Sequence, residues 1–151
     1  KREDGRSWAN WAKEESGLVP ERTHWLGALQ TSDYHTLLAY TQAHLYLTVP
    51  FVLSWSLLEA MAAGCPIVGS ATAPVEEVID HGQQGLLADF WEPAQIAEAL
   101  ERLLADPDRA TCLGKAARKT ARGYSAEKGL KGWKDLISGF AQPVRKPEYS
   151  S

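Results

Sequence analysis

The sequence predicts an α/β fold in which a parallel β-sheet carries helices on its faces. Short apolar segments typical of buried parallel strands alternate with segments of helical periodicity, and this alternation is characteristic of βαβ units. The chain has 151 residues, of which 44% are hydrophobic and 23% charged, as expected for one globular domain. After Pro93 the apolar strand segments stop, so the C-terminal part is predicted to be helical.

The predicted strands are short apolar segments that polar or turn residues separate. They cover residues 23–26, 45–49, 66–69 and 85–88. A single domain is expected over residues 1–141. Residues 142–151 are polar and include two prolines, so they are expected to form a loose tail.

Helices are predicted where apolar residues recur at helical spacing. They cover residues 8–15, 32–42, 56–63 and 75–80, a segment from Pro93 to the break at residues 106–107, and residues 113–122 and 125–137. Ser32 and Ser125 are predicted N-caps. Gly64, followed by Pro66, is predicted to end its helix in the left-handed conformation.

Composition and charge argue against several classes of protein. The net charge is −3 and the pI about 5.8, so no basic surplus exists to bind nucleic acid or an anionic membrane. Cys65 and Cys112 have no metal-ligand spacing, and the four histidines are scattered. A reducing, cytoplasmic location is expected, with a peripheral position at the inner membrane left open for a full-length protein.

Residues 46–68 carry the strongest functional signal, because they read as strand, loop, helix, tight turn and strand. The loop after a parallel strand opens at the carboxyl edge of the sheet, where open α/β folds bind ligands. The start of the next helix offers free N–H groups that favour a phosphate. Glu59, placed in the first turn, can accept hydrogen bonds from two ribose hydroxyls. The alternative is that Glu59 only stabilises the helix dipole, by about 0.3–1 kcal/mol.

The segment Leu58-Glu59-Ala60-Met61-Ala62-Ala63-Gly64, followed by Pro66-Ile67-Val68, resembles a known family signature. It is the signature of the C-terminal domain of retaining glycosyltransferases with the GT-B fold, group 1 (family 4). Segments 25–29, 70–79, 80–82, 85–87 and 93–100 resemble the same domain in the same order. The resemblance extends from about Arg22 to Gly139. It implies a Rossmann-like donor-binding domain, the C-terminal half of a GT-B enzyme.

The resemblance also implies which residues bind a nucleotide-sugar donor. They are Glu59, Leu53, Ser54, Trp55, Ser56, Gly27 and Leu29. Glu59 matches the second Glu of the Glu-x7-Glu motif, which binds the donor ribose. The stretch from Leu53 to Ser56 matches the loop and helix start that meet the sugar and the distal phosphate, and Gly27 and Leu29 fall near the base. The resemblance implies a metal-independent enzyme, so neither a cofactor nor a metal is expected.

The sequence departs from the family at the first Glu of that motif, where Phe51 stands. An aromatic ring cannot stabilise positive charge at the reacting carbon, so the catalytic residue is unknown, and packing is the expected role of Phe51. The family's Gly-Phe-Gly is replaced by Val52-Leu53-Ser54.

In the family that this chain resembles, an Arg and a Lys bind the donor diphosphate, and the matching positions would precede Lys1. An N-terminally truncated chain is therefore expected, without its acceptor-binding domain and two central strands. A homodimer or strand exchange could compensate for the missing strands.

These observations predict a domain that binds a nucleotide-sugar in an enzyme that transfers a hexosyl group with retention, and a chain that is inactive alone. A non-catalytic nucleotide-binding or scaffold module of the same fold is the alternative, which Phe51 favours. A sugar epimerase or phosphorylase of similar architecture is a weaker possibility, because fold analogy does not choose between chemistries.

Overall fold

The computed structural model describes residues 5–49 and 52–140. The chain divides into two compact units, Lys1–Asp33 and Tyr34–Ser151, and each is described by itself. The single domain expected over residues 1–141 stays a prediction. The expected tail at residues 142–151 and the position of Phe51 lie outside the described residues.

Within the described part of the first unit, before residue 31, lie an α-helix and a 3₁₀ turn. These are α1 (Trp8–Glu15) and η1 (Pro20–Arg22). Ser7 caps α1, since its hydroxyl accepts a hydrogen bond from the Asn10 backbone N–H at 3.1 Å. The rings of Trp8 and Trp11 meet edge to face with centroids 5.9 Å apart. The helix predicted at residues 8–15 is therefore confirmed.

The strand predicted at residues 23–26 is wrong, because this segment joins no ladder in the described chain. A strand forms only when its backbone N–H and C=O groups find a neighbouring strand. Thr23 instead closes the 3₁₀ turn: its N–H bonds the Pro20 carbonyl at 3.2 Å and its hydroxyl bonds the Val19 carbonyl at 2.9 Å. Trp25 and Leu26, read as apolar strand residues, are exposed.

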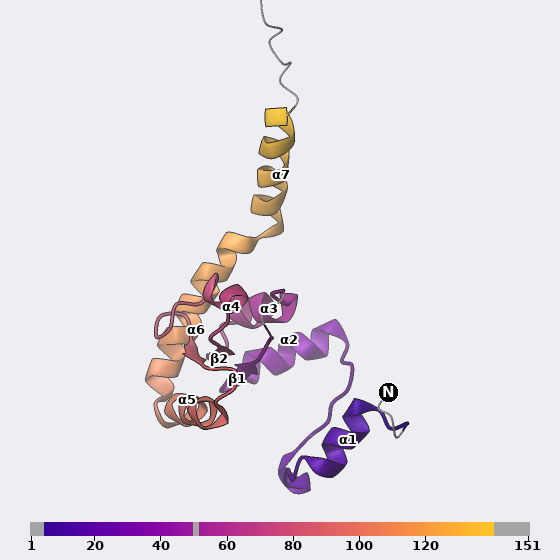
Figure 1. Cartoon of the computed structure of the whole chain (residues 1–151). Coiled ribbons are helices and arrows are strands. Elements are labelled where there is room, and N and C mark those ends of the chain that lie inside the picture. Colours follow the sequence, from indigo (N-terminus) through magenta and orange to yellow (C-terminus); the bar gives the residue numbers. More distant parts are fainter. Residues whose placement is uncertain (1–4, 50–51, 141–151) are drawn as a thin grey trace, which may run out of the picture. The chain divides into compact units, whose positions relative to one another are not determined.

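From Thr31 onwards the chain alternates helices and strands (Figure 1). The elements are α2 (Thr31–Tyr40), β1 (His44–Tyr46), α3 (Trp55–Ala63), β2 (Ile67–Ser70), α4 (Ala73–Glu76), β3 (Leu86–Ala88), α5 (Pro93–Ala105), α6 (Pro107–Ala121), η2 (Arg122–Tyr124) and α7 (Ala126–Phe140). The expected alternation, followed by a helical C-terminal part, is confirmed.

The strands form a parallel sheet in the order β1-β2-β3. His44 lies opposite Ile67, and Val68 lies opposite Leu86. All residues of the central strand β2 are buried. The predicted parallel sheet with flanking helices is therefore confirmed, although the first strand ends at Tyr46 and not at residue 49.

Helices cover both faces of this sheet, as neighbouring residues of β2 show. Ile67 belongs to a core cluster with Leu57 and Met61 of α3, whereas Val68 belongs to a second cluster with Leu103 of α5. Figure 1 shows α3 and α5 on opposite sides of the strands. Burial on both faces explains why the central strand β2 begins with consecutive apolar residues.

The chain turns sharply after α3. Gly64 adopts φ 82°, and its N–H bonds the Met61 carbonyl at 3.0 Å. This left-handed position suits glycine, and the helix end predicted there is confirmed. Ser125 also has its predicted role, since its hydroxyl accepts a hydrogen bond from the Lys128 N–H at 3.3 Å. The Ser32 cap is wrong, because α2 already begins at Thr31.

The helix predicted at residues 113–122 begins much earlier, at Pro107. Asp106 ends α5 and also caps α6, because its carboxylate accepts a hydrogen bond from the Arg109 N–H at 2.9 Å. A proline in the first turn costs little there, since its missing N–H would have no intrahelical partner. The Asp-Pro pair that breaks one helix therefore starts the next.

The last helix, α7, has a pronounced apolar side and buries none of its residues. The apolar side chains predicted there are all exposed: Leu130, Trp133, Leu136 and Ile137. In the part of the chain that the structure describes, no helix combines the length and the apolar character needed to cross a membrane.

Candidate functional site

The candidate site is built where β1 ends and α3 begins, at the carboxyl edge of the sheet. Ser54 is the N-cap of α3, with an extended backbone at φ −80° and ψ 144°. Its hydroxyl accepts a hydrogen bond from the Ser56 N–H at 3.3 Å and lies 2.9 Å from the Ser56 hydroxyl. The start of a helix carries partial positive charge, so this edge favours an anion such as a phosphate.

Tyr46 connects the end of β1 to the start of α3. Its hydroxyl accepts a hydrogen bond from the Ser54 backbone N–H at 2.9 Å, and the side chain is buried. We did not identify Tyr46 from the sequence, where it reads only as an apolar strand residue. A phenol at the last position of a strand is the signal that could have indicated a polar contact beyond it.

Ser70 ties the segment after β1 to the neighbouring strand. Its hydroxyl accepts a hydrogen bond from the Thr48 N–H at 3.1 Å and donates one to the Thr48 carbonyl at 3.2 Å. Thr72 lies 3.4 Å from the same hydroxyl. Ser70 is fully buried, so these contacts satisfy a polar group that burial would otherwise penalise. The contacts with Ser70 also explain why the ladder between β1 and β2 stops before Thr48.

Glu59 lies one turn into α3, on the exposed side of the helix. The expected place in the first turn is wrong: α3 begins at Trp55, and its first turn holds no acidic residue. Helix-dipole stabilisation falls off within the first turn. The alternative that Glu59 only stabilises the helix dipole therefore loses most of its basis.

Glu59 interacts electrostatically with Tyr34 of α2. Partial burial and, next, the Glu59 carboxylate raise the pKa of the Tyr34 hydroxyl above its ordinary value of 10.0. Glu59 thus acts electrostatically on a residue of the neighbouring helix. Within residues 5–49 and 52–140, no hydrogen bond or ion pair of Glu59 is found. Its oxygens can therefore accept hydrogen bonds from a ligand.

A cavity of about 440 Å³ lies beside this face of α3. One wall comes from α3 and the other from the end of α6 and the turn that follows. The lining residues are Trp55, Leu58, Glu59, Ala62, Arg118, Ala121, Arg122, Tyr124 and Ser125. The lining includes one acidic residue, Glu59, and two arginines, a combination that suits a polar ligand with both hydroxyl and anionic groups.

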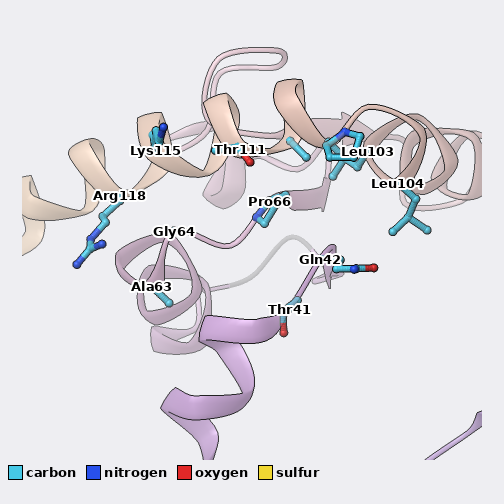
Figure 2. Close-up of a pocket in the computed structure, with 12 residues that line it drawn as sticks. Thr41, Gln42, Ala63, Gly64, Pro66, Leu103, Leu104, Thr111, Lys115 and Arg118 are labelled. Atoms are coloured by element: carbon cyan, nitrogen blue, oxygen red, sulfur yellow. The ribbon is translucent and has the colours of Figure 1, made fainter.

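A second cavity, of about 380 Å³, opens at the other end of the strands (Figure 2). Gln42 precedes β1 and Pro66 precedes β2, so this cavity lies at the amino ends of the strands. Figure 2 shows the guanidinium of Arg118 pointing away from it. This cavity is distinct from the one beside Glu59, although Arg118 lines both.

The remaining predicted residues are placed differently. Leu53 is half-buried and packs against the core, while Trp55 is largely exposed. Gly27, with φ 65°, and Leu29 belong to the first unit, so their predicted contact with a base stays a prediction. Among the described residues, no group of three or more His, Cys, Asp or Glu side chains could hold a metal ion.

Residues 11–120 match the family described as Glycosyl transferases group 1. The match covers more than half of the chain, and the chain therefore belongs to this family. The resemblance noted in the sequence is confirmed at this level.

Curated relatives agree with this assignment. The chain is 32% identical over 87 residues to the D-inositol 3-phosphate glycosyltransferase of Salinispora tropica. This match covers 58% of this chain and 17% of that protein. It is 30% identical over 102 residues to the N-acetyl-alpha-D-glucosaminyl L-malate synthase of Bacillus anthracis, covering 68% and 26%. The chain thus spans less than a third of the length of these relatives.

Solved structures show the same fold. Sucrose-phosphate synthase from Thermosynechococcus elongatus matches with a TM-score of 0.74 and 23% identity, covering 88% of this chain and 33% of that one. The Anabaena protein HepE in complex with UDP-glucose matches with a TM-score of 0.72 and 19% identity, covering 86% and 35%. The predicted Rossmann-like α/β fold of the GT-B type is therefore confirmed.

Proposed function

We propose that this chain is the C-terminal, donor-binding domain of a family 4 glycosyltransferase that transfers a hexosyl group from a nucleoside-diphosphate sugar with retention. The observation that carries the proposal is the start of α3 at the carboxyl edge of β1, one turn before the exposed Glu59. Membership of the group 1 family supports it, as does the presence of UDP or UDP-glucose in matching structures. A cytoplasmic location suits such a donor.

Each part of the donor has a place in this proposal. The N–H groups at the start of α3, from Leu53 to Ser56, receive the sugar and the distal phosphate. The carboxylate of Glu59 accepts hydrogen bonds from the vicinal hydroxyls of the ribose. During transfer, negative charge develops on the leaving diphosphate, and the positive end of the helix stabilises that charge.

Calorimetric titration of the 151-residue chain with UDP and GDP tests the proposal. We expect Glu59→Ala to weaken binding at least tenfold, because hydrogen bonds to a charged group contribute about 1.5–3 kcal/mol. Glu101→Ala, which removes an exposed carboxylate from α5, is the matched control and should bind like the wild type. A folded wild-type chain that binds neither nucleotide would contradict the proposal.

Metal independence is a second expectation. With no metal ion in the proposed site, the affinity for UDP or GDP should be the same in EDTA as in MgCl₂. Titrations in the two buffers at equal ionic strength measure this. Binding that requires Mg²⁺ would show that the donor phosphates need a cation which the helix terminus does not replace.

A non-catalytic module of the same fold is the second candidate, and Phe51 at the position of the first motif glutamate favours it. A catalytically inactive homologue would still bind a nucleotide, whereas a pure scaffold would not. The calorimetric titration with UDP and GDP therefore separates an inactive homologue from a pure scaffold. Hydrolysis or transfer of a radiolabelled nucleotide-sugar, measured with the complete enzyme, separates both from an active transferase.

A further inference from the structure

The start of α3 is fixed by a contact that crosses from the sheet to the helix. The Ser54 N–H donates to the Tyr46 hydroxyl at 2.9 Å, although the two residues are eight positions apart in the sequence. Tyr46 is only 8% exposed and belongs to the core cluster that includes Leu57 and Ile67. Because its ring is held in the core, the hydroxyl is a rigid reference point for the N-cap.

The other groups of Ser54 point into the helix. Its hydroxyl bonds the Ser56 N–H, and its carbonyl accepts a hydrogen bond from the Leu57 N–H at 3.2 Å. These contacts shape the first turn, but both of them would move together with it. The bond to Tyr46 is the one that relates this turn to the strand.

A second anchor holds the other end of the connection. Ser70 of β2 bonds both the N–H and the carbonyl of Thr48. The chain is therefore held at Thr48 by one buried hydroxyl and at Ser54 by another. Backbone N–H groups bind an anion well only when they are preorganised around the place it occupies.

We propose that Tyr46 is a positioning residue: its hydroxyl fixes the start of α3 so that the N–H groups there receive the distal phosphate of the donor. This inference rests on the proposed function, because it names the residue that orients the phosphate end of that site. Tyr46 does not touch the donor itself and acts through Ser54.

The test compares Tyr46→Phe with Tyr40→Phe in the 151-residue chain. Both changes remove one phenol oxygen, but Tyr40 is exposed on α2. NMR measures hydrogen exchange at the Ser54 amide, and NMR titration gives the affinities for UDP and UMP and for GDP and GMP. UMP and GMP lack the distal phosphate, so they report on the rest of the site.

We expect Tyr46→Phe to speed exchange at the Ser54 amide. It should lower the affinity for the diphosphates UDP and GDP by up to about tenfold, which corresponds to about 1.4 kcal/mol. The affinity for the monophosphates UMP and GMP should stay unchanged. Tyr40→Phe should change neither. A general loss of structure would instead weaken UDP and UMP alike, so the ratio of the two affinities separates positioning from folding.

Two failures can be told apart. A wild-type chain that binds no nucleotide overturns the proposed function, whatever the amide exchange shows. A wild-type chain that binds UDP or GDP overturns the role of Tyr46 alone if Tyr46→Phe leaves the diphosphate affinity unchanged or lowers both affinities equally. Fast hydrogen exchange at the Ser54 amide of the wild-type chain would also overturn the role of Tyr46. This readout needs no variant, so it applies even if Tyr46→Phe does not fold.

Discussion

At the scale of single residues, Gly114 sets how closely α6 approaches the end of α3. Gly114 is buried, and a Cβ added there would collide with the backbone carbonyl oxygen of Gly64. Backbone cannot move aside as a flexible side chain can. Gly64 itself needs its left-handed conformation to end α3. Two glycines distant in sequence therefore allow the contact that packs α6 against α3.

We expect Gly114→Ala to lower the free energy of unfolding. Overpacking costs about 1–3 kcal/mol, and the better helix propensity of alanine returns at most about 1 kcal/mol of this. Urea unfolding followed by circular dichroism measures the change.

Gly129→Ala is the control for this substitution, because Gly129 is also helical and nothing lies within 4 Å of the added Cβ. It should cost no stability. Equal effects of the two substitutions would show that α6 and α3 do not meet at this glycine pair.

The role of Gly64 could be predicted from the sequence, whereas that of Gly114 could not. A glycine followed by Pro66 at the end of an apolar helix is a local signal. The collision at Gly114 involves a residue 50 positions away, and nothing near Gly114 indicates it. The same holds for Tyr46 and Ser70, whose partners Ser54 and Thr48 are identified only once the strands are in place.

At the scale of elements, β1 begins with a titratable residue. The His44 side chain is half-buried, and the His44 backbone N–H donates a hydrogen bond to the Pro66 carbonyl at 2.8 Å. Burial lowers the pKa of the His44 imidazole below its ordinary value of 6.5. The folded chain therefore holds the proton less readily than the unfolded chain, where the ordinary value applies.

This pKa shift predicts that acid weakens the fold. The contribution of His44 is fully present above pH 6.5, and it is lost as the pH falls from there towards the lowered folded-state value. Urea unfolding at pH 7.5 and at pH 5.5 should show less stability at the lower pH, and His44→Gln should reduce that difference. His35→Gln, on the exposed side of α2, should not. Equal pH dependence in His44→Gln and wild type would contradict the assignment.

At the scale of the whole molecule, β1 is an edge strand of the sheet that bears on how the chain assembles. In the part of the chain that the structure describes, β1 pairs only with β2. An edge strand presents unpaired N–H and C=O groups that another chain can pair with. Leu45 of β1 is exposed as well. This arrangement is the physical basis for the expected homodimer or strand exchange.

We predict that the 151-residue chain self-associates as its concentration rises, which sedimentation velocity measures. Leu45→Lys should shift the population towards monomer, because a charge on an edge strand opposes pairing. Leu37→Lys makes the same change at an exposed position of α2 and should have no effect. A single monomeric species at every concentration would rule out both the homodimer and the exchange.

The sequence by itself determined the alternation of helices and strands, the turn at Gly64 and the helix start that faces the carboxyl edge of the sheet. These features depend on local periodicity and on residues close together in the chain, so the pattern contains them. The donor-binding role of Glu59 came from the resemblance to the family as well as from its place in the predicted helix, and it stays a prediction. The helix itself, α3, begins one residue earlier than predicted.

Only the tertiary structure decided which apolar segments became strands and what holds the site. Residues 23–26 have the composition of a strand but no partner strand among the described residues. Strand β1 ends at Tyr46 because the Ser70 hydroxyl forms the hydrogen bonds with the Thr48 backbone. Strand pairing and side-chain anchoring join residues far apart in sequence. Their energy depends on which groups meet in space, and a one-dimensional pattern does not specify that meeting.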